Sequence, residues 1–297
     1  MRVIRAKSSG FCWGVERAIQ VAREQADGGK RTVYTDGPLI HNNQMMTALG
    51  KEGVREVGDY QSSSAIELAD EEREDSVVVV RAHGISPERR KYLKDLEMPF
   101  KDATCPDVGI IAGKVRMHAE KDYDVVIFGD PKHPEVIGLM GYAGDKGHAV
   151  QTKEDLDALP EFSGGVVMVS QSTMFTHEFE RLSVRLGEKY SELIVFDTIC
   201  GATKERQSDL RQLVDDGAEA IVVIGGHHSA NTCKLAMLAE SHGRPTFHVE
   251  TAEDLDSPAF DGFDVIGVTA GASTPDVIVG KVIDKLSDFS TTGVLCT

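Results

Sequence analysis

Three cysteines divide the chain into nearly equal lengths. Cys12 and Cys105 are 93 residues apart, and Cys105 and Cys200 are 95 residues apart. Thiolates are good ligands for zinc and for iron–sulfur clusters. Three of them could bind zinc with an open fourth position, or three irons of a cubane cluster whose fourth iron is left free. Either centre would keep one coordination position for a substrate.

Polar residues recur at matched distances after each cysteine. A first cluster comes 28 or 29 residues after each thiol, at His41, His133 and Ser229. A second cluster comes 67 to 73 residues after each thiol, at His83, Ser172 and Ser273. Self-similarity at a fixed period indicates an internal repeat. The sequence therefore predicts a threefold repeat with one thiol in each unit.

The spacing of the thiols bears on which centre they could form. Structural zinc sites usually bring two cysteines together as C-x₂-C, and the chain has no such pair. Cys105 is followed by Pro106, as in the Cys-Pro ending of ferredoxin motifs. These features favour a cluster over zinc, although His133 or another histidine could supply a fourth ligand and close the centre. Cys233 and Cys296 lie outside the repeat, and we interpret them as structural or incidental.

The composition limits the class of protein. Apolar residues make up 41% of the 297 residues, enough for a sizeable core, and no run suggests a membrane span. The net charge of −16 argues against nucleic-acid binding, which needs clustered Lys and Arg. The first residues lack the apolar stretch of a signal peptide, and five cysteines make a disulfide framework unexpected. We expect a cytoplasmic protein without nucleic-acid or membrane partners.

Short strands should alternate with helices in each repeat. Each cysteine follows a short strand and precedes a helical stretch, and two β-branched runs come later in each unit. These runs are TVYT and VVVVRA, then DVVIFG and VVMVS, and finally AIVVIG and DVIGVT. Continuous apolar strands between helices are typical of parallel sheets that are buried on both faces.

We therefore expect an α/β fold of three pseudo-symmetric units with small parallel sheets, arranged around a central site. The units span residues 13–104, 105–199 and 200–288, with residues 1–12 and the C-terminal tail at the centre or surface. The six residues of the two polar clusters fall at the expected strand ends, where ligands of such sheets bind. Helix N-termini at these ends attract anions. The loops thus favour a phosphate or diphosphate ligand.

Glu135 follows Pro134 and His133, and this arrangement singles it out among the carboxylates. Proline fixes the local chain so that His133 and Glu135 could face one pocket. Near an anionic ligand the pKa of a carboxyl group rises, which would suit Glu135 to donate a proton. The alternative is an ordinary Glu at a helix start, where the helix dipole favours it.

In order and spacing, seven motifs resemble those of the 4-hydroxy-3-methylbut-2-enyl diphosphate reductase family, the iron–sulfur enzymes that end the non-mevalonate isoprenoid pathway. They are GFCWGVERA, GPLIHNN, RAHG, DATCP, HPEV, GGxxSxN and VTAGAST. The resemblance extends from residue 1 to about 288. It implies a trefoil of three α/β domains around a [4Fe–4S] cluster whose ligands are Cys12, Cys105 and Cys200.

The resemblance also implies roles for the polar residues. Those that would bind the diphosphate are His41, His83, His133, Ser229, Asn231 and Ser273. Glu135 matches the proton-relay acid, and Ser172 keeps a hydroxyl where Thr is expected, so that it can position substrate and protons. Two departures occur: Ala230 replaces a common Ser and would remove one phosphate hydrogen bond, and Gly201 replaces an expected Tyr or Asn.

The implied reaction is the reductive dehydroxylation of (E)-4-hydroxy-3-methylbut-2-enyl diphosphate to isopentenyl and dimethylallyl diphosphate. The substrate oxygen would lie on the open iron of the cluster, and reduced ferredoxin or flavodoxin would supply electrons. One alternative is an iron–sulfur hydro-lyase that acts on another anionic substrate without net reduction. Another is a nonenzymatic sensor with a labile cluster, which would have no use for Glu135.

Overall fold

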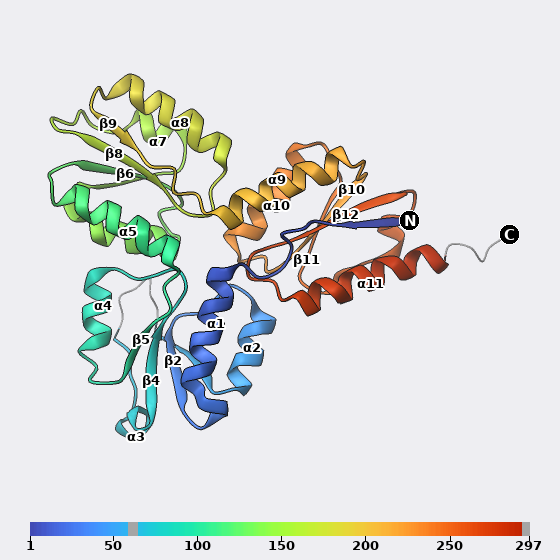
Figure 1. Cartoon of the computed structure of the whole chain (residues 1–297), viewed down its shortest axis with the longest axis horizontal. Coiled ribbons are helices and arrows are strands. Elements are labelled where there is room, and N and C mark those ends of the chain that lie inside the picture. The colour runs from blue at the N-terminus through green and yellow to red at the C-terminus, as the bar shows by residue number, and fades with distance from the viewer. Residues whose placement is uncertain (59–64, 293–297) are drawn as a thin grey trace. The chain divides into compact units, whose positions relative to one another are not determined.

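Residues 1–58 and 65–292, which the computed structural model describes, form three four-stranded sheets in which all strands are parallel (Figure 1). The first sheet has the order β3 (Val54–Val57), β2 (Thr32–Asp36), β4 (Ser76–Val80), β5 (Phe100–Asp102). The second has the order β7 (Gly147–Val150), β6 (Asp124–Phe128), β8 (Val166–Ser170), β9 (Leu193–Val195). The third has the order β11 (Thr246–Val249), β10 (Ala220–Ile224), β12 (Val265–Ala270), β1 (Arg2–Arg5). The expectation of an α/β fold with small parallel sheets is confirmed.

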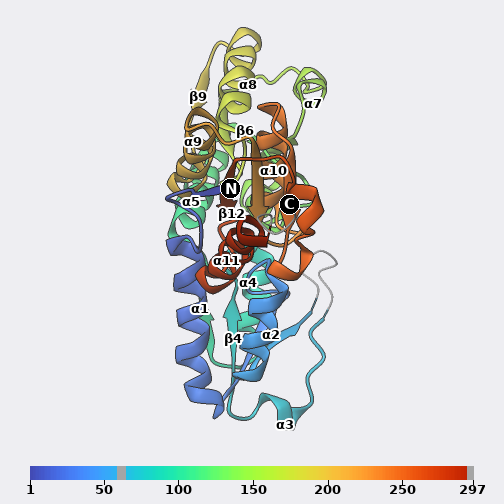
Figure 2. The same cartoon turned by 90° about the vertical axis from the view of Figure 1, so that its right-hand side faces the viewer.

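Eleven α-helices of the described residues connect or follow these strands. The first six are α1 (Trp13–Ala26), α2 (Asn43–Lys51), α3 (Asp70–Arg73), α4 (Pro87–Lys94), α5 (Pro106–Ala119) and α6 (Pro134–Ala143). The others are α7 (Lys153–Asp157), α8 (Thr176–Lys189), α9 (Gly201–Asp215), α10 (Ala230–Ser241) and α11 (Asp276–Thr292). In Figure 2, α1 and α2 lie on opposite sides of β4, so helices cover both faces of the first sheet. A sheet covered in this way must be apolar on both faces.

The six β-branched runs of the sequence are the two central strands of each sheet. Every residue of β4, β8 and β10 is buried, which explains why these strands are continuously apolar rather than alternating. The edge strands are shorter or partly exposed. In β3, for example, one residue is buried and three are partly or fully exposed. The central strands therefore hold the cores, and the edge strands complete the sheets.

The three sheets share one order of elements, and the cysteines occupy equivalent places in it. In each sheet, an outer strand pairs with the second central strand and then leads into a thiol: β5 before Cys105, β9 before Cys200 and β1 before Cys12. A long helix begins directly after each thiol. This recurrence is the structural form of the repeat seen in the cysteine spacing.

The chain forms two compact units. The first contains residues 1–13, 41–45 and 201–297 and includes the third sheet, in which β1 pairs with β12 (Figure 1). Its core joins apolar residues of β10 and β12 with α11, among them Val222, Val268 and Val282. The second unit contains residues 14–40 and 46–200 and includes the first and second sheets. Its cores lie on those sheets, around Val78 in the first and Val126 and Val167 in the second.

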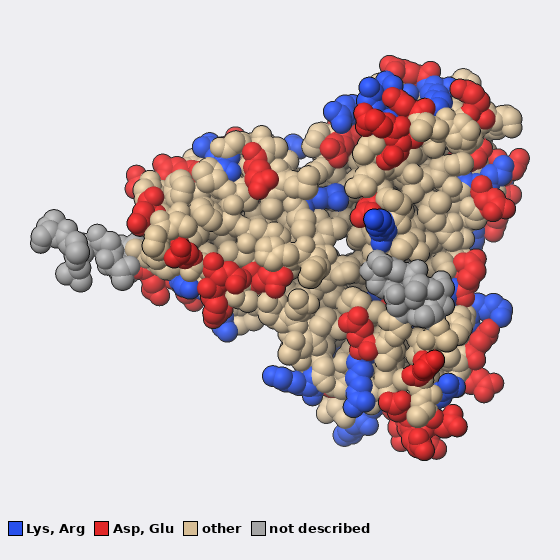
Figure 3. Space-filling view, turned by 180° about the vertical axis from the view of Figure 1, so that it is seen from behind, with Lys and Arg blue, Asp and Glu red and all other residues tan. Residues whose placement is uncertain are grey.

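The charged side chains are mixed in sign. On the face shown in Figure 3, Lys and Arg are interspersed with Asp and Glu rather than gathered into one extended basic area. Within the described parts of the chain, none of the helices has both the length and the apolar character that crossing a membrane requires.

Candidate functional site

The backbone of each thiol is bonded to the loop that follows the second central strand of its sheet. The N–H of Cys105 donates to the carbonyl of Ala82 at 2.9 Å, beside His83. The N–H of Cys200 donates to the carbonyl of Ser172 at 3.0 Å. The N–H of Cys12 donates to the carbonyl of Ala272 at 3.0 Å, beside Ser273. One repeated hydrogen bond thus places each thiol next to a member of the second polar cluster.

Each thiol also lies at the start of a helix. Cys105 is the N-cap of α5, which has Pro106 in its first turn, and α1 and α9 begin at the residues after Cys12 and Cys200. The positive end of a helix dipole stabilises an anionic thiolate at this position. All four cysteines of the described residues are free thiols, and the three of the repeat are partly exposed. Three such thiolates are a suitable donor set for an iron–sulfur cluster or zinc.

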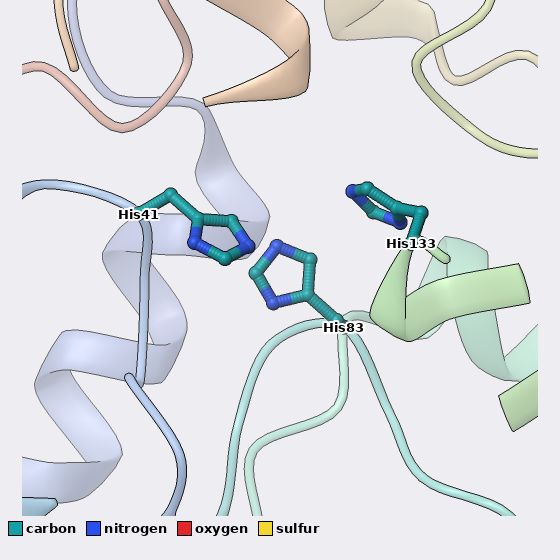
Figure 4. Close-up of side chains that lie close together, drawn as sticks. All are labelled: His41, His83 and His133. Atoms are coloured by element: carbon teal, nitrogen blue, oxygen red, sulfur yellow. The ribbon is translucent and has the colours of Figure 1, made fainter. Parts of the chain in front are cut away.

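His83 and His133 lie close together in the second unit. Their ring centroids are 5.5 Å apart, with the planes at 79° (Figure 4). His83 follows β4, whereas His133 is the N-cap of α6 and its Nδ1 accepts the N–H of Glu135 at 3.2 Å. Pro134 at the first position of α6 provides the backbone geometry for this cap. Two imidazoles from consecutive sheets can therefore reach one anionic ligand.

Glu135 and Ser172 form a buried carboxyl–hydroxyl pair in the same unit. Glu135 is only 2% exposed. The Ser172 N–H donates to one carboxylate oxygen of Glu135 at 2.7 Å, and the Ser172 Oγ donates to the other at 2.6 Å. Because the Ser172 carbonyl also accepts the N–H of Cys200, a continuous chain of contacts joins the acid to a thiol loop.

The environment of Glu135 tunes its acidity. Burial raises the pKa of Glu135 from 4.5 to about 7, and the two hydrogen bonds from Ser172 oppose this rise without cancelling it. The negative charge of Asp107 adds to the increase. The sequence attributed a raised pKa to a bound anion, whereas in the structure burial is the main cause and needs no ligand. A carboxyl group with a pKa of about 7 can carry a proton near neutral pH.

The remaining polar residues of the site lie in the first unit. His41 follows β2, and its carbonyl accepts a hydrogen bond from Ser273 Oγ at 3.0 Å. Ser229 is the N-cap of α10, where its Oγ accepts the N–H of Thr232 at 3.4 Å. Asn231 lies in the first turn of α10 and is buried. The N-terminus of α10 and the Ser273 loop together offer hydroxyl, amide and backbone donors to an anion.

Both departures from the expected motifs lie at the start of a helix. Ala230 is the first residue of α10, directly after the Ser229 cap. Gly201 opens α9, and a Cβ atom at this position would meet nothing within 4 Å. The fold therefore has no steric requirement for glycine at position 201.

Residues without a place in the repeat have ordinary structural contacts. His118, His148 and His248 form hydrogen bonds with Lys114 O, Asp124 Oδ1 and Gly225 O, respectively. The Cys233 thiol donates to the carbonyl of His227 at 3.1 Å, and burial raises its pKa. Cys296 lies outside the described residues.

Gln171 was not singled out in the sequence, although it sits between two site segments. Its side chain is fully buried, its Oε1 accepts the N–H of Asp130 at 3.0 Å and its Nε2 donates to Thr173 at 2.7 Å. It therefore ties the turn before His133 to the loop that carries Ser172. The signal in the sequence was its position in the Gln-Ser-Thr stretch after an apolar strand.

Comparison with known proteins identifies close relatives over nearly the whole chain. The family model of the LytB protein matches residues 3–287. A 4-hydroxy-3-methylbut-2-enyl diphosphate reductase of Opitutus terrae is 60% identical over 96% of this chain and 99% of its own. One of Alkaliphilus oremlandii is 36% identical over 97% and 100%.

Solved structures agree with this result. The E-1-hydroxy-2-methyl-but-2-enyl-4-diphosphate reductase of Plasmodium falciparum superposes with a TM-score of 0.88, at 28% identity over 96% of this chain and 88% of that chain. A second, described as (E)-4-hydroxy-3-methyl-but-2-enyl diphosphate reductase, the terminal enzyme of the non-mevalonate pathway, has a TM-score of 0.67 and 34% identity. It covers 97% of this chain and 100% of its own.

Proposed function

The chain belongs to the LytB protein family, and we propose from this premise that it reductively removes the hydroxyl group of (E)-4-hydroxy-3-methylbut-2-enyl diphosphate. The allylic C–O bond breaks, two electrons and two protons are consumed, and water leaves. The products are isopentenyl and dimethylallyl diphosphate, which differ in the carbon that receives the second proton. The reaction is that of an oxidoreductase in the non-mevalonate isoprenoid pathway.

The buried Glu135–Ser172 pair is the observation that carries this proposal. A binding protein or sensor gains nothing from a carboxyl group that is fully buried, holds its proton near pH 7 and is bonded to the loop next to a thiol. A dehydroxylase needs such an acid, because hydroxide is a poor leaving group until it is protonated. Glu135 supplies this proton, and Ser172 orients the carboxyl group.

Cys12, Cys105 and Cys200 are the proposed ligands of a [4Fe–4S] cluster. Their free thiols, their equivalent positions in three sheets and the helix that begins after each one support this assignment. When bound, such a cluster would supply electrons singly and offer one iron without a protein ligand as a Lewis acid. The thiols would hold it through anionic sulfur stabilised by three helix dipoles.

The diphosphate is proposed to bind to five residues of the first and second polar clusters and to Asn231. They are His41, His83, His133, Ser229, Asn231 and Ser273. The position of Ser229 and Asn231 at the N-terminus of α10, whose helix dipole attracts anions, supports this role. Fixing the diphosphate orients the five-carbon chain so that its hydroxyl group can meet Glu135.

Three further features belong to this proposal. The chain is divided into α/β units at residues 13–104, 105–199 and 200–288, each supplying the two central strands of one sheet. Reduced ferredoxin or flavodoxin delivers the electrons. The protein acts in the cytoplasm, a location supported by its free thiols, which persist in a reducing compartment.

Electron counting tests the proposed function. Anaerobically reconstituted protein should oxidise reduced methyl viologen only when the allylic diphosphate is present, with two viologen molecules consumed per substrate. Substrate consumption without a reductant would instead indicate a hydro-lyase. If the cluster is fully formed but the substrate does not promote oxidation of reduced methyl viologen, the sensor would be the better interpretation.

A further inference from the structure

Arg206, on α9, is a buried cation that the proposed site does not use. It is 2% exposed, although arginine is among the residues least often buried. Its guanidinium donates to three backbone carbonyls from three separate segments. Nη2 bonds Gly10 O at 2.6 Å, Nη1 bonds Ala202 O at 2.9 Å and Nε bonds Ala270 O at 3.3 Å. All three contacts lie within the first compact unit.

Each of the three segments leads to a residue of the site. Gly10 lies two residues before Cys12, in left-handed backbone with a φ of 121°. Ala270 ends β12, three residues before Ser273. Ala202 lies in the first turn of α9, two residues after Cys200. A single planar guanidinium therefore joins three segments. They are the loop before Cys12, the end of β12 before Ser273 and the first turn of α9 after Cys200.

The fork geometry of arginine is what allows this connection. Its N–H donors point in fixed directions within one plane, so three carbonyls bonded to it are fixed relative to one another. Lysine is a point donor on a flexible stem and cannot impose the same geometry. The neighbouring segment is also held by Asp209 of α9, which accepts the N–H of Ser8 at 2.7 Å. Arg206 is the deeper of these two attachments of α9 to the loop before Cys12.

We propose that Arg206 is a positioning residue that sets the Cys12 loop and the Ser273 loop in the geometry needed to retain the cluster and bind the diphosphate. This inference rests on the proposed function for its cluster and substrate readouts. The order of the loop itself can be measured without either. Supporting contacts one layer behind metal ligands commonly change metal affinity or activity by 10- to 100-fold.

The test compares Arg206→Gln and Arg206→Lys with Arg89→Gln. Arg89 is the matched control, because it is also a buried guanidinium, but its ion pair is with Asp36 at 2.6 Å in the second unit, whereas the three bonds of Arg206 lie in the first. Both Gln variants remove a buried cation and leave acceptors behind. They differ in whether the Cys12 and Ser273 loops lose an attachment.

The first readout is the time-resolved fluorescence anisotropy of Trp13 in the apoprotein. Trp13 is the single tryptophan of the chain and directly follows Cys12, so its local motion reports on the Cys12 loop. Arg206→Gln should add a fast depolarising motion that wild type and Arg89→Gln lack, and Arg206→Lys should show it partly. Equal anisotropy in all four proteins would overturn the inference, whatever happens to the proposed function.

The second readout uses reconstituted protein. Release of iron to a ferrous chelator should be roughly tenfold faster in Arg206→Gln than in Arg89→Gln, and KM for the substrate should rise more than kcat falls. Unchanged iron release and KM in Arg206→Gln, with a normal wild-type cluster, would overturn the inference alone. A wild type that forms no cluster would contradict the proposed function instead. If Arg206→Gln fails to fold, iron release and KM of Arg206→Lys are compared with those of Arg89→Gln and test the inference in its place.

Discussion

In the proposed reaction, Glu135 and Ser172 divide the work of proton delivery. Burial raises the pKa of the carboxyl group to about 7, so that a substantial fraction is protonated at neutral pH, while Ser172 donates hydrogen bonds to both of its oxygens. The two effects act in opposite directions on the pKa, and burial is the larger. The acid is therefore both available and oriented.

Replacing Glu135 by Gln tests its role as the proton donor. Gln keeps the shape and the N-terminal place on α6 but has no acidic proton. We expect turnover to fall by roughly 10²- to 10⁴-fold, the usual contribution of general acid catalysis. The cluster spectrum should not change, since Glu135 is not a ligand. Normal turnover in this variant would remove Glu135 from the mechanism.

The pH dependence of the wild type follows from the same group. Below a pH of about 7 Glu135 is protonated and able to donate, and above it the carboxylate form dominates. The value of kcat/KM should therefore fall as the pH rises through about 7. In Glu135→Gln the residual activity should lack this step. A wild-type profile that stays flat from pH 6 to 9 would contradict the assignment.

Ser172 can be separated from Glu135 by two substitutions. Ser172→Ala removes the hydroxyl bond that lowers the pKa of Glu135, so the falling limb should move to higher pH. The lost bond to a carboxylate is worth about 1.5–3 kcal/mol, which corresponds to roughly a 10- to 100-fold loss of kcat. Ser172→Thr retains the hydroxyl and should retain most activity. Equal rates in Ala and Thr variants would show that the hydroxyl is not used.

At the scale of elements, close backbone packing holds the loops of the third sheet. A Cβ atom on Gly271 would lie 2.0 Å from Thr232 Oγ1, and Thr232 is fully buried in the first turn of α10. The end of β12 can therefore approach α10 only because residue 271 is glycine. This contact sets the distance between the Ser273 loop and the Ser229 cap.

Gly271→Ala should accordingly destabilise the protein and weaken substrate binding. We expect a loss of roughly 1–3 kcal/mol in the free energy of unfolding, the usual cost of overpacking, measured by denaturant titration of the apoprotein. Gly280→Ala in α11 is the control, because its Cβ atom would meet nothing within 4 Å. That change should stabilise the helix by roughly 0.5–1 kcal/mol. Equal stabilities for the two variants would show that the contact at Gly271 relaxes at little cost.

The central strands were predictable from the sequence, and the edge strands largely were not. VVVV and IVVI are apolar without alternation, which only strands buried on both faces require. By contrast, β3 and β7 are four-residue segments with polar or glycine residues and little periodic signal. The pairing of β1 with β12 joins the two ends of the chain, and no local pattern reveals such a contact.

The site was predictable to the extent that it follows from strand ends. His133, Ser229 and Ser273 were singled out because polar loops after buried parallel strands mark the ligand side of a sheet, and the structure places all three after such strands. The bonding of Glu135 to Ser172 could not be inferred, since the two belong to different strand ends of one sheet. The bonds of Arg206 to Ala270 and Gly10 could not be inferred either, because these residues are 64 and 196 positions away in the chain.

In the molecule as a whole, the proposed cluster depends on three equivalent thiols. Cys105→Ser should abolish or strongly weaken cluster binding, whereas Cys233→Ser should leave it intact, because Cys233 lies on α10 and its thiol bonds the carbonyl of His227 before that helix. Iron and sulfide content and the electron paramagnetic resonance spectrum of the reduced protein measure this difference. An intact, active cluster in Cys105→Ser would break the ligand assignment.

The most direct test of the central claim is product analysis after anaerobic turnover. Cluster-reconstituted protein would be given (E)-4-hydroxy-3-methylbut-2-enyl diphosphate and a strong one-electron reductant, and the products would be separated and identified by mass spectrometry. The account predicts isopentenyl and dimethylallyl diphosphate, formed only when the reductant is present. Unchanged substrate in the presence of a complete, reduced cluster would contradict it.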